Sequence, residues 1–120
     1  MKIAISTSGE NTAVPLDSRF GRTSKFLIYD MDAETFLLID NRQNLNAAQG
    51  AGIQAAQTVA KAGVNSVITG HCGPKAFRVL RAADISIYHS EASTVGEALD
   101  LLKNGKLKEA KDADVEGHWL

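Results

Sequence analysis

The spacing of apolar positions changes several times along this chain, and each change marks the border of an expected element. Residues 2–6 alternate polar and apolar before a Thr-Ser-Gly turn, which is typical of a first strand. Two β-rich runs, 25–31 and 36–40, are joined by a short polar turn and predict an antiparallel hairpin. The pattern after the hairpin predicts a helix at 52–62, a strand at 64–69, a helix at 74–83, a strand at 85–89 and a helix at 95–103.

Turn and cap residues support these borders. Gly63 is placed to end the first helix, Pro74 suits the first turn of the second, and the Thr94 to Glu97 stretch is a capping box for the third. The order strand, strand, strand, helix, strand, helix, strand, helix predicts an α/β fold with a mixed sheet covered on both faces. Ligands of such sheets bind beyond the carboxyl ends of parallel strands, so the loop after Ile5 and the turn after Thr69 should meet there.

Length and composition limit the protein to a single domain. The chain has 120 residues, 44% of them hydrophobic, which suits one self-folding domain at 1–104 followed by a charged tail at 105–120. A single cysteine excludes an intramolecular disulfide framework and a Cys-x-x-Cys zinc site. No apolar run reaches membrane-spanning length and no signal peptide is evident, so we expect a cytoplasmic protein without a membrane partner.

The charges are unevenly distributed. The formal net charge of −1 gives no support to nucleic-acid binding, yet no carboxylate lies between Asp40 and Asp84, a stretch that carries five Lys or Arg residues. Paired acids for two-metal hydrolysis are missing from the expected strand ends, and the sequence has neither a phosphate-binding Gly-x-x-x-x-Gly-Lys-Ser/Thr motif nor a dinucleotide fingerprint. An anion is therefore the ligand class to consider.

The turn after residue 69 has the features of an anion site. It joins an expected strand to a helix whose first amides have no partners within the helix, and the helix dipole favours negative charge there. Near Lys75, Cys72 would have a lowered thiol pKa that favours the thiolate, although a small apolar residue in a tight turn explains it equally well. The candidate binding residues of this turn are Gly70, His71, Cys72, Gly73, Pro74 and Lys75.

The long first loop offers a second basic cluster. Guanidinium groups can engage two acceptor atoms of an anion together, and this loop has two of them within four residues. The alternative is an ordinary solvated loop. The candidate binding residues here are Arg19, Phe20, Gly21, Arg22 and Lys25.

Two further functions stay open from the residues. The stretch from His71 to Arg78 has the His-Cys-x5-Arg spacing of thiol phosphatases, with Cys72 as nucleophile, but a helix starting at Pro74 would carry Arg78 away from an anion at the first amides. The exposed edge of the hairpin at 25–40 could instead bind a partner protein.

The chain resembles the dinitrogenase iron-molybdenum cofactor-binding family over residues 1–104. The resemblance is carried by Phe-Gly-Arg at 20–22, the hairpin, Gly-Ala-Gly at 50–52, Thr-Gly-His-Cys-Gly-Pro-Lys-Ala at 69–76 and the helix that opens with Thr-Val-Gly-Glu at 94–97. It is most similar to members that hold a mixed molybdenum-copper sulfide cluster without covalent attachment.

This resemblance implies a ribonuclease-H-like three-layer fold, with a five-stranded mixed sheet, one antiparallel strand and three helices. It also implies a carrier or assembly protein rather than an enzyme, which would bind a molybdenum-copper sulfide cluster or a related molybdenum-iron-sulfur cofactor and exchange it with donor or acceptor proteins. The loop at 19–25 and the turn at 70–75 would be its binding segments, with Cys72 as a candidate metal ligand. Outer sulfides accept hydrogen bonds, so three to five charge-assisted contacts of roughly 1.5–3 kcal/mol each would supply the ~8 kcal/mol of micromolar binding.

Overall fold

The computed structural model describes residues 1–9, 16–41 and 51–110. Five strands and three helices follow one another in the predicted order, and their borders lie within about two residues of the expected ones. In chain order they are β1 (Lys2–Thr7), β2 (Lys25–Asp30), β3 (Thr35–Asp40), α1 (Ala51–Lys61), β4 (Ser66–Thr69), α2 (Pro74–Ala82), β5 (Ser86–His89) and α3 (Val95–Lys103).

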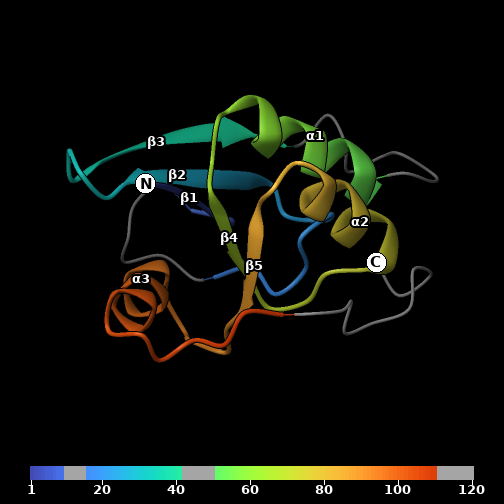
Figure 1. Cartoon of the computed structure of the whole chain (residues 1–120). Coiled ribbons are helices and arrows are strands. Elements are labelled where there is room, and N and C mark those ends of the chain that lie inside the picture. Colours follow the sequence, from blue (N-terminus) through green and yellow to red (C-terminus); the bar gives the residue numbers. More distant parts are fainter. Residues whose placement is uncertain (10–15, 42–50, 111–120) are drawn as a thin grey trace.

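The strands form one five-stranded sheet in the order β3-β2-β1-β4-β5. β1, β4 and β5 are parallel, whereas β2 runs antiparallel to both of its neighbours, so that β3 again points the same way as β1. β2 is therefore the one antiparallel strand. Helices α1 and α2 cover one face of the sheet and α3 covers the other (Figure 1). This arrangement confirms the predicted three-layer mixed α/β fold.

Each face of the sheet carries its own core because side chains alternate along the strands. Ala4, Phe26 and Ile28 pack beneath α1 and α2. Ile3 and Ile5 pack instead beneath α3. The β1 side chains of Ile3, Ala4 and Ile5 are all fully buried, as expected for a strand at the centre of a sheet that is covered on both faces.

Helix borders follow the predicted cap residues. Gly63 has φ of 78° just after α1, a conformation that side-chain-bearing residues avoid. The Thr94 side chain accepts a hydrogen bond from the Glu97 amide at 3.2 Å, which caps α3. The Glu97 carboxylate reaches back to the amide of Ser93 at 3.1 Å, one residue earlier than in a standard capping box.

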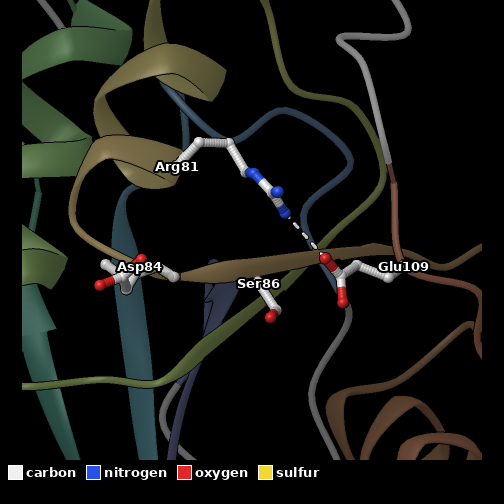
Figure 2. A pocket seen from close by; sticks show the side chains of 5 residues that line it. Arg81, Asp84, Ser86 and Glu109 are labelled. Atoms are coloured by element: carbon white, nitrogen blue, oxygen red, sulfur yellow. Dashed lines mark hydrogen bonds and ion pairs between the residues drawn. The ribbon is translucent and has the colours of Figure 1, made fainter.

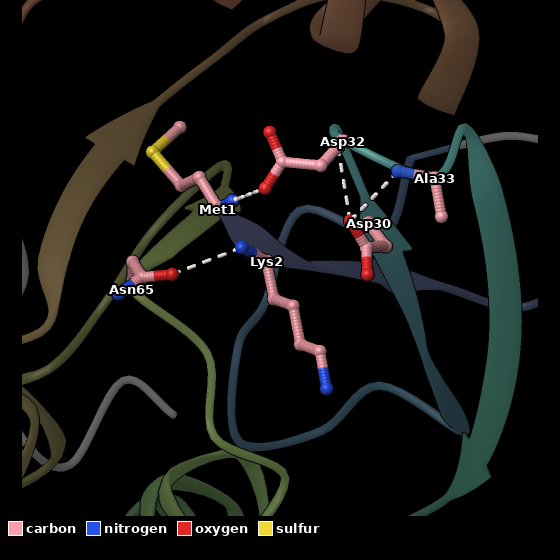
Figure 3. A network of polar contacts seen from close by, with 6 residues as sticks. All are labelled: Met1, Lys2, Asp30, Asp32, Ala33 and Asn65. Atoms are coloured by element: carbon pink, nitrogen blue, oxygen red, sulfur yellow. Dashed lines mark hydrogen bonds and ion pairs between the residues drawn. The ribbon is translucent and has the colours of Figure 1, made fainter.

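Polar contacts secure the hairpin end of the sheet (Figure 3). The N-terminal ammonium of Met1 lies 2.7 Å from the Asp32 carboxylate, and the Lys2 amide donates to Asn65 Oδ1 at 2.9 Å. Asp30 accepts from the amides of Asp32 and Ala33. These amide bonds, helped by the nearby N-terminus and Lys2, lower the pKa of Asp30 below its ordinary value of 3.8.

The chain after α3 turns back along the outer edge of β5. Glu109 bridges Tyr88 in antiparallel fashion, and the Ala110 amide donates to the Ile87 carbonyl at 2.7 Å. The first residues of the charged segment thus cover this edge of the sheet. Within the described ranges, no helix combines the length and the apolar character needed to cross a bilayer.

Candidate functional site

The connections diverge at the carboxyl end of the parallel strands. β1 and β4 are adjacent, yet the chain leaves β1 toward β2 on one side, and leaves β4 through α2 toward β5 on the other. This is the topological switch point at which open α/β sheets bind ligands. The helices start at this same edge because each follows a strand that ends there, so their positive dipole ends face it.

The structure brings the two basic segments together at this point. The Phe20 amide donates to the His71 carbonyl at 3.2 Å, and Arg19 and His71 form a parallel β-bridge. A Cβ on Gly70 would lie 2.8 Å from both Cα and O of Ser18, so only glycine allows the turn to approach the loop this closely. Residues 18–20 of the loop after β1 are thus in direct contact with the turn after β4.

The starts of α1 and α2 meet the same loop through small residues. A Cβ on Gly21 would lie 3.0 Å from Cα and N of Gly52, and a Cβ on Gly52 would lie 3.1 Å from the Cβ of Ala76. Gly52 is in the first turn of α1 and Ala76 in the first turn of α2. Two helix N-termini therefore converge on the Arg19–Arg22 segment.

A layer of buried hydroxyl and amide groups lies under this surface. The Ser6 hydroxyl is within 2.6 Å of the Asp17 carbonyl and 2.9 Å of Thr69 Oγ1, and the Asp17 amide donates back to the Ser6 carbonyl. On the other side, Thr23 Oγ1 donates to the Thr7 carbonyl at 2.8 Å, and the Asn41 side-chain amide donates to the Thr23 carbonyl at 2.8 Å.

Six of the seven buried polar residues of the described chain belong to this end of the sheet, and only Ser66 lies elsewhere. The six are Ser6, Thr7, Thr23, Asn41, Thr69 and Ser90. None of the six is among the binding residues predicted from the sequence. The sequence feature that they share is a Ser, Thr or Asn within or next to the end of a strand, at a position where an apolar residue would extend the core. They fix the backbone of both binding segments because buried polar groups cost free energy unless they are hydrogen-bonded.

The predicted binding residues differ in exposure. Arg19 and Lys75 are exposed, and the two glycines Gly21 and Gly73 are buried. The others are partly buried: Arg22, Lys25, Gly70, His71 and Pro74. Phe20 and Cys72 are fully buried in the core beneath α1 and α2. The Phe20 ring lies 5.1 Å from that of Phe26. Phe20 and Cys72 therefore position the backbone of the site from below.

The geometry around Cys72 does not favour thiol phosphatase chemistry. Its thiol donates to the Gly73 carbonyl at 3.7 Å and is shielded from solvent. Residues 74–78 form the first turns of α2, so they cannot wrap around a phosphate, and Arg78 is carried along the helix away from its start. A thiolate nucleophile with an arginine clamp is not assembled here.

A separate polar hollow lies at the other end of α2 (Figure 2). It has a volume of about 270 Å³ and is lined by Arg81, Asp84, Ile85, Ser86 and Glu109. The Arg81 guanidinium is ion-paired with Glu109 at 2.8 Å, which leaves little positive charge for an anion. Across the described residues, no group of three or more His, Cys, Asp or Glu side chains is arranged to hold a metal ion.

The fold and this basic edge define a class: small three-layer α/β proteins that present two loops at the switch point between β1 and β4. Comparison with known proteins identifies the family. A family model described as dinitrogenase iron-molybdenum cofactor matches residues 1–105, and the chain belongs to this family. This confirms the resemblance seen in the sequence.

Solved and curated relatives agree with this assignment. The chain is 34% identical to the orange protein from Desulfovibrio gigas, whose apo structure has a TM-score of 0.92 and matches 95% of this chain and 96% of that one. A candidate NifB protein from Thermotoga is 31% identical, with a TM-score of 0.84 over 97% of this chain and 98% of that one. An uncharacterised Methanocaldococcus jannaschii protein is 31% identical over an alignment of 104 positions that covers 80% of this chain and 87% of that protein.

Proposed function

We propose that this protein binds an anionic molybdenum-containing metal-sulfide cluster between residues 19–25 and 70–75, and carries it without catalysing a reaction. Membership of the iron-molybdenum cofactor family and likeness to the orange protein support a cluster-binding or carrier role rather than catalysis. The cluster is cargo, taken from a donor protein and passed to an acceptor.

The observation that carries the proposal is the contact between the two basic segments. The Phe20–His71 hydrogen bond and the close approach of Gly70 to Ser18 join them where two helix starts converge. Arg19 and Lys75 present charges on exposed side chains. A large anion at this edge can therefore be reached by guanidinium, ammonium and backbone N–H donors from separate parts of the sequence.

The donors fit outer sulfides better than metal ions. Pro74 has no N–H, so the α2 start contributes the amide of Lys75, which has no carbonyl partner within the helix. Sulfide anions accept such bonds, whereas a metal bound by the protein alone would need a cluster of His, Cys or acidic ligands, and the described residues form no such cluster. The mode of binding is thus hydrogen bonding to the surface of the cluster.

The proposed cargo is a molybdenum-copper sulfide cluster, with a related molybdenum-iron-sulfur cofactor as the other member of the same class. Cys72 would become a metal ligand only if its turn opened, because the thiol is buried and donates to the Gly73 carbonyl. Holding the cluster therefore rests on the exposed cations and on backbone amides.

A thiomolybdate titration tests the proposal. The apo protein is titrated with tetrathiomolybdate and then copper, desalted, and its metals are measured in the protein fraction. We expect colour to co-elute with the protein at a fixed molybdenum-to-copper ratio. The triple variant Arg19→Gln, Arg22→Gln and Lys75→Gln should bind at least about a hundredfold more weakly, since three charge-assisted contacts are lost.

A matched triple variant separates the site from net charge. Lys61→Gln, Lys106→Gln and Lys108→Gln remove the same charge from exposed positions outside the two segments and should leave binding unchanged. Equal retention of colour by the two triple variants would refute the assigned binding site.

A further inference from the structure

The two edges of the sheet are treated differently. The outer edge of β5 is covered by Glu109 and Ala110, whereas β3 is the last strand on its side. Its three consecutive apolar side chains are exposed, with Phe36 at 44%, Leu37 at 56% and Leu38 at 36%. Edge strands are usually protected by lysine, proline or a bulge, and the sequence Thr-Phe-Leu-Leu-Ile at 35–39 contains neither lysine nor proline. β3 lies clear of the three labelled helices along much of its length (Figure 1).

The backbone of β3 is set up for a further strand. The Asn41 amide donates to the Ser24 carbonyl, which makes this an inward-bonded pair in the register of β2 and β3. Because inward and outward bonding alternate along an antiparallel strand, the amides of Ile39 and Leu37 also face β2. The amides and carbonyls of Phe36 and Leu38 consequently point to the outer edge.

A second copy of the chain fits this edge poorly. Antiparallel pairing across a two-fold axis places one residue opposite its own copy. If that residue is Leu37, Glu34 stands opposite Asp40 of the other copy, twice over. If it is Leu38, Phe36 stands opposite Asp40. Like charges destabilise the first register, and the second sets a carboxylate against an aromatic ring, so the acidic residues that flank the apolar run disfavour self-pairing in both.

We propose that β3 is a docking edge for a partner protein that adds an extended apolar segment with lysine or arginine at both ends. Such a segment pairs its backbone with Phe36 and Leu38 and covers the exposed apolar side chains on both faces. Its basic ends lie beside Glu34 and Asp40. The Asp40 end of this surface adjoins Lys25 of the cluster site across the β2–β3 register, whereas Glu34 lies at the other end of β3, and the docking proposal does not depend on the proposed cargo.

A peptide probe tests the docking edge on the full chain. The probe has five central residues that alternate valine and threonine, with two lysines at each end and a fluorescent label. A second peptide replaces every lysine with glutamate. We expect saturable binding of the lysine peptide with a Kd below about 1 mM, and much weaker binding of the glutamate peptide. Amide exchange followed by NMR should slow at Phe36 and Leu38 but change little at Leu37, which is already bonded to β2.

Two variants and one control sharpen the test. Glu34→Lys should weaken the lysine peptide about three- to tenfold, because an attractive charge pair becomes repulsive. Leu37→Lys, which changes the most exposed of the three apolar side chains, should weaken it at least as much. Asp100→Lys makes the same charge change on the exposed surface of α3 and should have no effect.

Several results would overturn the proposal. These are equal binding of the two peptides, an equal effect of Asp100→Lys, or exchange protection away from β3. A concentration-dependent dimer that Leu37→Lys abolishes would also overturn it and would assign the edge to a second copy.

Discussion

Replacing Gly70 with alanine should separate the two basic segments without touching a charge. The new methyl group would lie 2.8 Å from Ser18 Cα and O and 3.0 Å from its Cβ. Two of these three atoms are backbone, so a side-chain rotation cannot relieve the clash. The loop at 17–20 must move away from the turn, and the hydrogen bond from the Phe20 amide to the His71 carbonyl, already 3.2 Å long, is lost.

The expected cost follows from these two effects. Overpacking a tight contact costs about 1–3 kcal/mol. Losing one backbone hydrogen bond adds about 1 kcal/mol. The free energy of unfolding should fall by about 2–4 kcal/mol, which for a domain of this size lowers Tm by roughly 8–16 °C. Because the displaced loop carries Arg19, tetrathiomolybdate binding should weaken as well.

Thermal unfolding and the thiomolybdate titration are measured on the same preparations, with Gly105→Ala as the control. Gly105 has φ of 68° and open space around it, so alanine there costs about 1–2 kcal/mol through backbone strain alone, far from the two segments. The control should lose stability but keep its affinity. If Gly70→Ala melted within about 2 °C of the parent, or lost no more affinity than Gly105→Ala, the close packing of the turn against the loop would be wrong.

Three further outcomes are expected. Ser6→Ala should lower the free energy of unfolding by about 1–3 kcal/mol in urea titrations, because the Asp17 carbonyl and the buried Thr69 hydroxyl both lose a hydrogen-bond partner. Thr58→Ala, which removes an exposed hydroxyl bonded to the Gln54 carbonyl, should change it by under about 0.5 kcal/mol. Thr94→Ala should cost about 1 kcal/mol by removing the α3 cap, and a Thr94→Ser variant should recover most of that loss. Because the folded pKa of Asp30 is lowered, its stabilisation is fully present above pH 3.8 and is lost as the pH falls through the folded value; Asp30→Asn should flatten acid unfolding in that window, and an unchanged acid limb would contradict the assignment.

Periodicity and turn chemistry predicted the fold well because each element is locally consistent. Gly63 ends α1, Pro74 starts α2 and Thr94 caps α3, as expected. The strand order was harder to obtain, since nothing in the residues alone states that β1 lies between β2 and β4. The resemblance to the family supplied the five-stranded sheet with one antiparallel strand, and the pairing of β1 with β4 bears it out.

The candidate site was predictable in position but not in its inner layer. Ligands of open α/β sheets bind beyond the carboxyl ends of the parallel strands, and this rule predicts the position of both segments from the order of the elements along the chain alone. The Ser6 hydroxyl contacts Asp17 and Thr69, which lie 11 and 63 positions away in the sequence. A single serine in an apolar strand does not indicate which distant residue it will bond. The burial of Cys72 was likewise unresolved by sequence, since a small thiol suits a reactive turn and a core equally.

The contact between segments 19–25 and 70–75 does not involve the charged side chains that these segments expose to solvent. This contact consists of the hydrogen bond from the Phe20 amide to the His71 carbonyl and the close approach of Gly70 to the Ser18 backbone. Beneath it, the Ser6 hydroxyl bonds the Asp17 carbonyl. The side chains of Arg19 and Lys75 are exposed and take no part in this contact. Neutralising those cations should therefore reduce affinity with little change in stability, whereas Gly70→Ala should reduce both. At this edge of the sheet, the stability of the fold and the affinity for an anion therefore depend on different groups and can be changed separately.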